Sequence, residues 1–219
     1  MYLSRLTLAE GAVDDPRFAS AFESAYGLHR SVWSLFGDGP ARQRDFLYRL
    51  DDLHGRPKLW TLSERQPAPS SLWFVESKEV RPLLQHGDLL EFELRVNPVV
   101  TRDGKRHDVV MDRKVQSGWR DRPVDEREPQ ATLVQAALAD WFEARAEGLG
   151  VRVHRLLAES YEVSRFAKPN GKKVQLGICD LTGILEVIDP DRFLASWSQG
   201  IGPAKGFGCG LMLIRRAQR

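Results

Sequence analysis

The sequence predicts an α+β fold in which the element order β-α-β-β-α-β occurs twice along 219 residues. Alternating polar and apolar residues indicate strands, apolar residues at three- and four-residue steps indicate amphipathic helices, and glycine and proline clusters separate these elements. Each unit has about 100 residues, the size of a ferredoxin-like sandwich, with two helices on one face of a four-stranded antiparallel sheet. We therefore expect tandem ferredoxin-like domains at residues 1–95 and 96–219, with one sheet face of each left free for a partner.

The first unit holds four predicted strands and one long amphipathic helix. The strands are expected at residues 2–8, 45–50, 58–63 and 88–96. The helix is expected over residues 16–36, because a proline stands in its first turn and apolar residues follow at helical spacing. Gly27 could break this helix locally, since glycine costs about 1 kcal/mol relative to alanine. Residues 70–84 are ambiguous and could hold a strand at 72–75 and a short helix at 78–84.

The second unit begins with a hairpin, because residues 103–105 have turn chemistry between two strand-like runs. A polar loop is expected over residues 112–130. Thr132 then caps a helix that ends by Gly150. The remaining elements are strands at 151–166 and 174–187, the latter interrupted near 180–183, a short helix at 189–197 and a strand at 211–214.

Composition excludes several classes of protein. The 32 Lys and Arg residues nearly balance the 30 Asp and Glu residues, so the net charge of +2 does not by itself indicate a nucleic-acid binder. No apolar run approaches about 18 residues, so no transmembrane helix is expected, and no signal peptide is apparent. The two cysteines, Cys179 and Cys209, lack metal-ligand spacing and cannot make a disulfide framework. These features favour a cytoplasmic protein with free thiols.

Basic residues are nevertheless concentrated in three segments. Residues 152–173 hold six basic and two acidic residues, residues 200–219 hold four and none, and residues 102–122 hold seven and four. Gathered on a hairpin tip and a terminal strand, such charges form a local positive surface of the kind that binds nucleic acid. The alternative interpretation is that each segment is an ordinary solvated loop.

Two segments carry more specific information. The first is Tyr-Gly-Leu-His-Arg at residues 26–30, on the first helix, and the second is residues 200–210, which hold five glycines. A glycine-rich loop lets backbone amides approach phosphates closely. This loop lacks the Gly-Lys-Ser/Thr of a nucleotide P-loop and precedes a strand, which disfavours ATP binding. A tight turn between helix and strand is the alternative role.

Together with Tyr-Leu-Ser-Arg-Leu at the N-terminus and Phe-Leu-Tyr-Arg at residues 46–49, these segments resemble the CRISPR repeat-processing endoribonucleases. The resemblance is closest to the CasE branch of type I-E systems and runs from Met1 to Ile214, although residues 112–130 match no motif. It implies binding of the CRISPR repeat hairpin and metal-independent cleavage at the 3′ base of the stem. The 2′-hydroxyl attacks, and the products are a 2′,3′-cyclic phosphate and a 5′-hydroxyl. The enzyme then keeps its product and becomes a subunit of the Cascade complex.

The same resemblance assigns catalytic roles to His29 and Tyr26. A histidine suits this chemistry because its reference pKa, about 6.5, lies near neutrality, and two residues three apart share a helix face. Tyr26 would position the reacting groups, and Lys205 or Arg30 would stabilise charge on the phosphate. The alternative for both His29 and Tyr26 is a packed core residue.

RNA binding is expected from the basic hairpin and the glycine-rich loop. The expected RNA-binding residues are Arg30, Arg165, Lys168, Lys172, Lys173, Lys205, Gly206 and Gly208. A-form RNA has a narrow major groove, so the hairpin would meet the stem through shape and phosphate contacts. Its alternative is a solvent-exposed basic hairpin without a partner.

Two other functions remain open on the sequence alone. One is a non-catalytic RNA-binding subunit of the same fold, which would not need His29. The other is a regulatory domain that binds a metabolite, which would not need the basic segments or the glycine-rich loop. No cluster of His, Asp and Glu has metal-ligand spacing. We therefore expect no metal, no cofactor and no membrane partner. The expected partners are the repeat RNA and other Cascade subunits.

Overall fold

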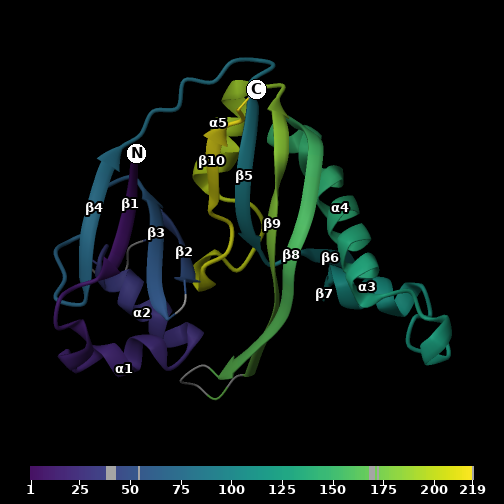
Figure 1. Ribbon diagram of the computed structural model, residues 1–219, viewed down its shortest axis with the longest axis horizontal. Helices are drawn as coiled ribbons and strands as arrows, with labels where there is room; N and C mark the ends of the chain where they lie inside the picture. Colours follow the sequence, from purple (N-terminus) through teal and green to yellow (C-terminus); the bar gives the residue numbers. More distant parts are fainter. Residues whose placement is uncertain (38–42, 54, 168–170, 172, 219) are drawn as a thin grey trace.

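Two four-stranded antiparallel sheets stand side by side in the computed structural model, which describes residues 1–37, 43–53, 55–167, 171 and 173–218 (Figure 1). The first sheet has the order β2-β3-β1-β4 and the second has the order β10-β5-β9-β8. In both, the first and third strands of the unit lie at the centre, which is the ferredoxin-like arrangement. The α+β fold expected from the sequence is confirmed.

The first sheet packs on two short helices. Its elements are β1 (Tyr2–Leu8), α1 (Arg17–Phe22), α2 (Ala25–Ser34), β2 (Phe46–Leu53), β3 (Arg56–Ser63) and β4 (Trp73–Glu79). The single helix expected over residues 16–36 is therefore two helices. They separate at Ser24, whose side chain accepts from the backbone N–H of Gly27 and caps α2. A Cβ on Gly27 would lie 2.0 Å from the Ser20 carbonyl oxygen, so the close contact of α1 with α2 requires glycine.

The second sheet is covered by α4 and α5. The elements of the second unit are β5 (Leu89–Val96), β6 (Val99–Arg102), β7 (Lys105–Asp108), α3 (Val109–Gln116), α4 (Gln130–Leu149), β8 (Val151–Ala167), β9 (Lys173–Val187), α5 (Pro190–Gln199) and β10 (Met212–Arg216). Strands β6 and β7 pair with each other in a separate two-stranded sheet. The expected loop at 112–130 is partly α3, which Asp108 caps by accepting from two backbone N–H groups. The interruption expected in β9 is absent, since residues 180–183 pair with both β5 and β8.

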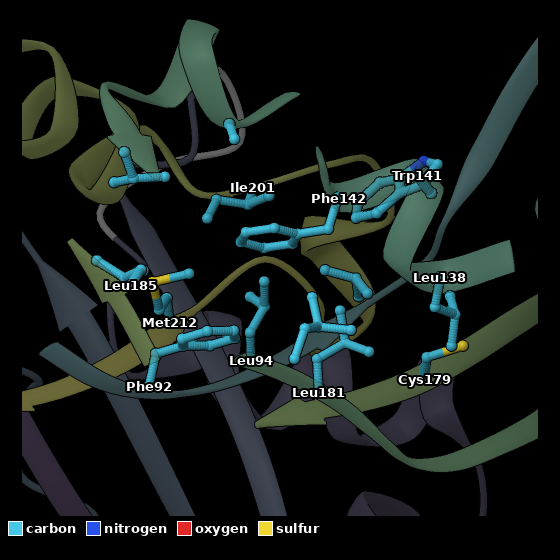
Figure 2. Close-up of a cluster of buried hydrophobic side chains, with 14 of the residues drawn as sticks. Phe92, Leu94, Leu138, Trp141, Phe142, Cys179, Leu181, Leu185, Ile201 and Met212 are labelled. Carbon is cyan, nitrogen blue, oxygen red and sulfur yellow. The ribbon is translucent and has the colours of Figure 1, made fainter. Parts of the chain in front are cut away.

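The strand at residues 88–96 belongs to the second sheet, not to the first as the sequence suggested. As β5, it pairs with β9 and β10, and the first sheet takes β4 as its fourth strand. Alternate β5 residues enter the second core, where Phe92 stacks on Phe142 of α4 with ring centroids 5.5 Å apart (Figure 2). The helix expected at 78–84 is absent. We therefore propose a domain boundary within residues 80–88, in place of one at 95/96.

The two units share a packed interface. Leu47 of β2 and Leu62 of β3 belong to the same buried cluster as the core of the second sheet. This packing brings β2 next to the loop that leads from α5 to β10 (Figure 1). Among the described residues, no helix has both the length and the apolar character needed to cross a membrane.

Candidate active site

The glycine-rich loop, residues 200–210, is held against β2 of the first unit. The N–H of Ile201 donates to the Gly210 carbonyl, 2.9 Å away, and the N–H of Gly210 donates to the Arg95 carbonyl, 2.7 Å away. Gly200 has a φ of +81°, and a Cβ there would lie 2.6 Å from Cδ2 of Leu47. Both the backbone conformation and the approach to β2 therefore require glycine at this position.

The loop places one carbonyl oxygen against His29. Nδ1 of His29, on α2, lies 2.7 Å from the carbonyl oxygen of Gly206, and the Tyr48 hydroxyl of β2 donates to the same oxygen at 2.8 Å. A carbonyl oxygen can only accept, so Nδ1 carries the hydrogen. In the neutral ring, Nε2 is then the basic nitrogen. The pairing fixes both the orientation and the tautomer of the half-buried imidazole.

Aromatic rings surround this imidazole. The ring centroids of Tyr26, Trp33 and Phe207 lie 5.9, 5.7 and 5.7 Å from that of His29. Phe207 in turn contacts Phe166 of β8, with centroids 4.9 Å apart. The site is therefore built from α2, the glycine-rich loop and the long hairpin of the second sheet. Such a surface offers partly exposed rings on which bases can stack.

Two cations stand beside the same loop. A Cβ on Gly206 would lie 3.7 Å from Nη1 of Arg44, and Lys205 precedes Gly206 in the chain. Burial lowers the pKa of the Arg44 guanidinium, and burial, together with the charge of Arg44, lowers the pKa of Lys205. Within the described ranges, neither cation is ion-paired to a carboxylate. Two neighbouring positive charges, one on the exposed Arg44 and one on the half-buried Lys205, favour binding of an anion at this point.

Tyr48 is a buried donor of this site. Burial raises the pKa of its hydroxyl well above the usual range, so the hydroxyl remains protonated and donates to Gly206. The Tyr48 ring also packs on Gly208, where φ is +80° and a Cβ would lie 3.3 Å from Cε2 of the ring. Sequence reasoning placed residues 46–49 in a motif but assigned no role to Tyr48 or to Arg44. Their part in the site depends on packing between segments about 160 residues apart, which local patterns do not record.

The structure brings four of the sequence-predicted residues together. Tyr26 and Gly206 lie beside the His29 ring, Lys205 is near enough to Arg44 to interact with its charge, and Gly208 packs against the Tyr48 ring. Among the described residues, no three His, Cys, Asp or Glu side chains are grouped so that they could hold a metal ion.

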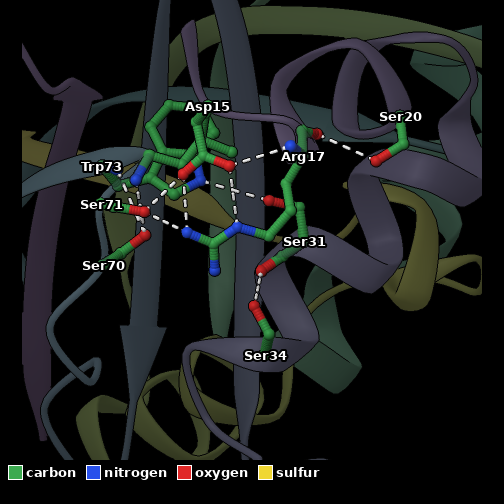
Figure 3. Close-up of polar contacts among 9 residues, drawn as sticks. Asp15, Arg17, Ser20, Ser31, Ser34, Ser70, Ser71 and Trp73 are labelled. Carbon is green, nitrogen blue, oxygen red and sulfur yellow. Dashed lines mark hydrogen bonds and ion pairs between the residues drawn. The ribbon is translucent and has the colours of Figure 1, made fainter. Parts of the chain in front are cut away.

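Arg30 lies elsewhere. It lines a separate hollow with Gly27, Ser34 and Leu72, on the side of α2 that faces α1 and the start of β4. Figure 3 shows the neighbouring polar contacts, in which Arg17 pairs with Asp15 at 2.6 Å. Nothing in the described part of the chain joins Arg30 to the His29 ring, so its expected contact with the same phosphate is not supported by this geometry.

Only part of the expected basic surface is without acidic partners among the described residues. Arg165 and Lys173 are exposed near the far end of the β8–β9 hairpin, whereas Lys168 and Lys172 lie outside the described residues. On the terminal strand β10, the positive charges are compensated by acidic neighbours. The pairs are Arg215 with Glu91 at 2.5 Å and Arg216 with Asp88 at 2.8 Å. The hairpin is therefore the better candidate for RNA contact.

The fold and the site define a tandem ferredoxin-like protein with an oriented histidine and two cations where its two units meet. The chain belongs to the family described as CRISPR associated protein, whose model matches residues 1–216.

Two curated relatives match almost the whole chain. The Escherichia coli K12 protein named CRISPR system Cascade subunit CasE is 27% identical over 217 residues, covering 98% of each chain. The Thermus thermophilus protein named CRISPR-associated endoribonuclease Cse3 is 26% identical over 237 residues, covering 98% of this chain and 99% of the relative. Neither comparison leaves a large unmatched segment in either protein.

Solved structures of similar proteins support the fold. A structure described as CRISPR endoribonuclease Cse3 bound to a 19-nucleotide RNA has a TM-score of 0.76 at 24% identity, covering 98% of this chain and 100% of that one. The Cas6e protein from Escherichia coli has a TM-score of 0.67 at 24% identity, covering 99% and 100%. Both likenesses extend over the two sheets, so the tandem arrangement is shared along the full length.

Proposed function

We propose that this protein is a cytoplasmic endoribonuclease that binds the CRISPR repeat hairpin and cleaves the precursor RNA at the 3′ base of its stem. It then stays with the mature guide RNA as a subunit of Cascade. The family assignment and the names of the two full-length relatives support this activity and this assembly. The observation that carries the proposal is the fixed His29 imidazole beside Arg44 and Lys205.

The reaction requires two proton transfers and stabilisation of one phosphate. The 2′-oxygen attacks the adjacent phosphorus, the bond to the 5′-oxygen breaks, and the products are a 2′,3′-cyclic phosphate and a 5′-hydroxyl. One proton leaves the 2′-oxygen and one reaches the 5′-oxygen. Nε2 of His29 performs one of these transfers, because Nδ1 is already bonded to Gly206.

The neighbouring residues serve the same phosphate. Arg44 and Lys205 are positioned for charge that develops on the non-bridging oxygens, where a partly desolvated cation is most effective. Tyr26 shares the helix face of His29 and orients the reacting nucleotide. The exposed basic hairpin holds the stem through its phosphates.

The decisive experiment uses the CRISPR repeat RNA of the host in excess EDTA. We expect a single cut at the 3′ base of the stem and a cyclic phosphate on the upstream product. A 2′-deoxy nucleotide 5′ of the cut should block cleavage but preserve binding. Cleavage of this deoxy substrate would overturn the mechanism. Tight binding of the all-ribose RNA without any cleavage would instead favour a non-catalytic RNA-binding subunit.

A further inference from the structure

Arg95 of β5 connects the second sheet to both segments that build the active site. Its guanidinium forms two hydrogen bonds with Asp180 of β9, at 2.8 and 2.9 Å, and a third with the carbonyl oxygen of Leu50 in β2. Its own carbonyl oxygen accepts from Gly210 at the end of the glycine-rich loop, at 2.7 Å. One residue therefore holds β2 with its side chain and the loop with its backbone.

These two contacts converge on the His29 site. Along β2, Tyr48 is two residues before Leu50, and its hydroxyl donates to the Gly206 carbonyl. Along the loop, Gly206 is four residues before Gly210. A shift of β2 or of the loop would therefore move the oxygen that fixes Nδ1 of His29.

The carboxylate that holds the Arg95 guanidinium is partly buried and has a second hydrogen-bond partner. The side chains of Arg95 and Asp180 are 25% and 23% exposed, and the Ser160 hydroxyl donates to the same carboxylate at 3.1 Å. The neighbouring Arg49 of β2 adds a second link between the units, with Glu93 of β5 at 3.5 Å. A bidentate pair on two adjacent strands fixes the plane of the guanidinium and hence the direction of its third bond.

We propose that Arg95 is a positioning residue, which aligns β2 and the glycine-rich loop so that Gly206 holds the His29 imidazole in its reactive orientation. The inference rests on the proposed ribonuclease function for its kinetic readout. Arg95 acts through Tyr48 and Gly206 and does not touch the RNA. A lysine cannot replace it, because a single ammonium cannot make the planar bidentate contact and also reach Leu50.

The kinetic test compares Arg95→Lys and Asp180→Asn with the wild type in single-turnover cleavage of the repeat RNA. A displacement of about 1 Å can cost about 10²-fold in rate, so we expect a rate loss of that order with the RNA dissociation constant within about threefold. The double variant should lose no more cleavage rate than Arg95→Lys alone, because both changes break the same Arg95–Asp180 pair. Arg5→Lys is the matched control, since Arg5 makes a comparable cross-strand pair with Glu76 at 2.7 Å. It should cleave at the wild-type rate.

A second readout does not depend on cleavage. ¹⁵N NMR of the histidines should show hydrogen on Nδ1 of His29 in the wild type and a mixture of tautomers in Arg95→Lys and Asp180→Asn. Unchanged rates and an unchanged His29 spectrum in these variants would overturn the inference. The inference would also be overturned if the rate loss came with an equal loss of RNA affinity, or if Arg5→Lys lost as much cleavage rate as Arg95→Lys. A wild type that does not cleave would refute the proposed function, and the NMR comparison would still decide the role of Arg95.

Discussion

The carbonyl oxygen of Gly206 lies 2.7 Å from Nδ1 of His29, across 177 residues of sequence. The second unit thus sets the tautomer of a ring that belongs to the first. Neither unit alone contains the site, because the helix supplies the imidazole and the loop supplies the acceptor that orients it. The chemistry therefore depends on the packing of the two sheets as well as on the residues at the site.

The cations beside Gly206 should matter more for cleavage than for folding. We expect Arg44→Ala or Lys205→Ala to slow single-turnover cleavage by about 10²-fold, because each removes a donor from the phosphate at the transition state. Each should also reduce the slope of log affinity against log salt by about 0.7, the value for one phosphate contact on a single strand. Binding titrations at several salt concentrations, together with cleavage rates at saturating protein, measure both effects.

The control for these cations is Arg81→Ala, since Arg81 is 80% exposed and pairs with Glu79 away from the site. If both Arg44→Ala and Lys205→Ala cleave the RNA at the wild-type rate, these cations have no part in the mechanism.

The exposed hairpin should contribute to affinity and not to the chemical step. Replacing Arg165 and Lys173 by alanine, with Lys168 and Lys172 changed as well, should weaken binding and flatten its salt dependence. The rate at saturating protein should remain within a few-fold of the wild type, because the hairpin contacts the His29 site through the rings of Phe166 and Phe207, which this variant keeps. Arg152→Ala is a control on the same strand, as Arg152 is paired with Glu186 at 3.0 Å. An unchanged salt slope in the hairpin variant would argue against RNA contact there.

The two buried thiols should make the fold less stable in alkali. Burial raises the pKa of Cys209 to about 12 and also raises that of Cys179 above its usual range. Above about pH 9 the unfolded chain loses these protons and the folded chain keeps them. The free energy of unfolding should then fall by up to about 1.4 kcal/mol per pH unit for each thiol. The stabilisation that the two protonated thiols contribute to the folded state is therefore complete below about pH 9 and is lost as the pH rises toward 12.

Urea unfolding between pH 8 and pH 10.5 tests this dependence. The Cys209→Ala variant should show a shallower decline than the wild type over the same range. Equal slopes for the two proteins would show that the Cys209 thiol does not carry the effect.

Local patterns predicted most of the elements but not which sheet each strand joins. The alternation of Leu90, Phe92, Leu94 and Val96 indicates a strand with one buried face, and it is equally compatible with either unit. The stacking of Phe92 on Phe142 of α4 places β5 in the core of the second unit, and that contact joins residues 50 positions apart in the sequence. The expected boundary at 95/96 therefore fell after β5, whereas the sheets divide before it.

The site was predicted in part, for a similar reason. His29 and Tyr26 stood out because the chain resembles a family whose catalytic histidine and tyrosine match these positions, and the glycine-rich loop stood out because its residue types suit phosphate binding. Arg44 has no such local signal, because its proposed role depends on the glycine-rich loop packing beside the start of β2, which places Gly206 next to the guanidinium. Arg30 was expected, as an alternative to Lys205, to stabilise charge on the phosphate. Successive residues of a helix point about 100° apart, however, and Arg30 faces the other side.

The most direct test of the central claim is single-turnover cleavage of the repeat RNA by His29→Ala in EDTA. General acid–base catalysis contributes about 10²–10⁴-fold, so the rate should fall by that factor while the RNA dissociation constant stays within a few-fold of the wild type. His154→Ala is the matched control, because His154 pairs with Glu186 on the second sheet. This variant should cleave at the wild-type rate. Cleavage by His29→Ala at the wild-type rate would contradict the assignment of His29 as the catalytic residue.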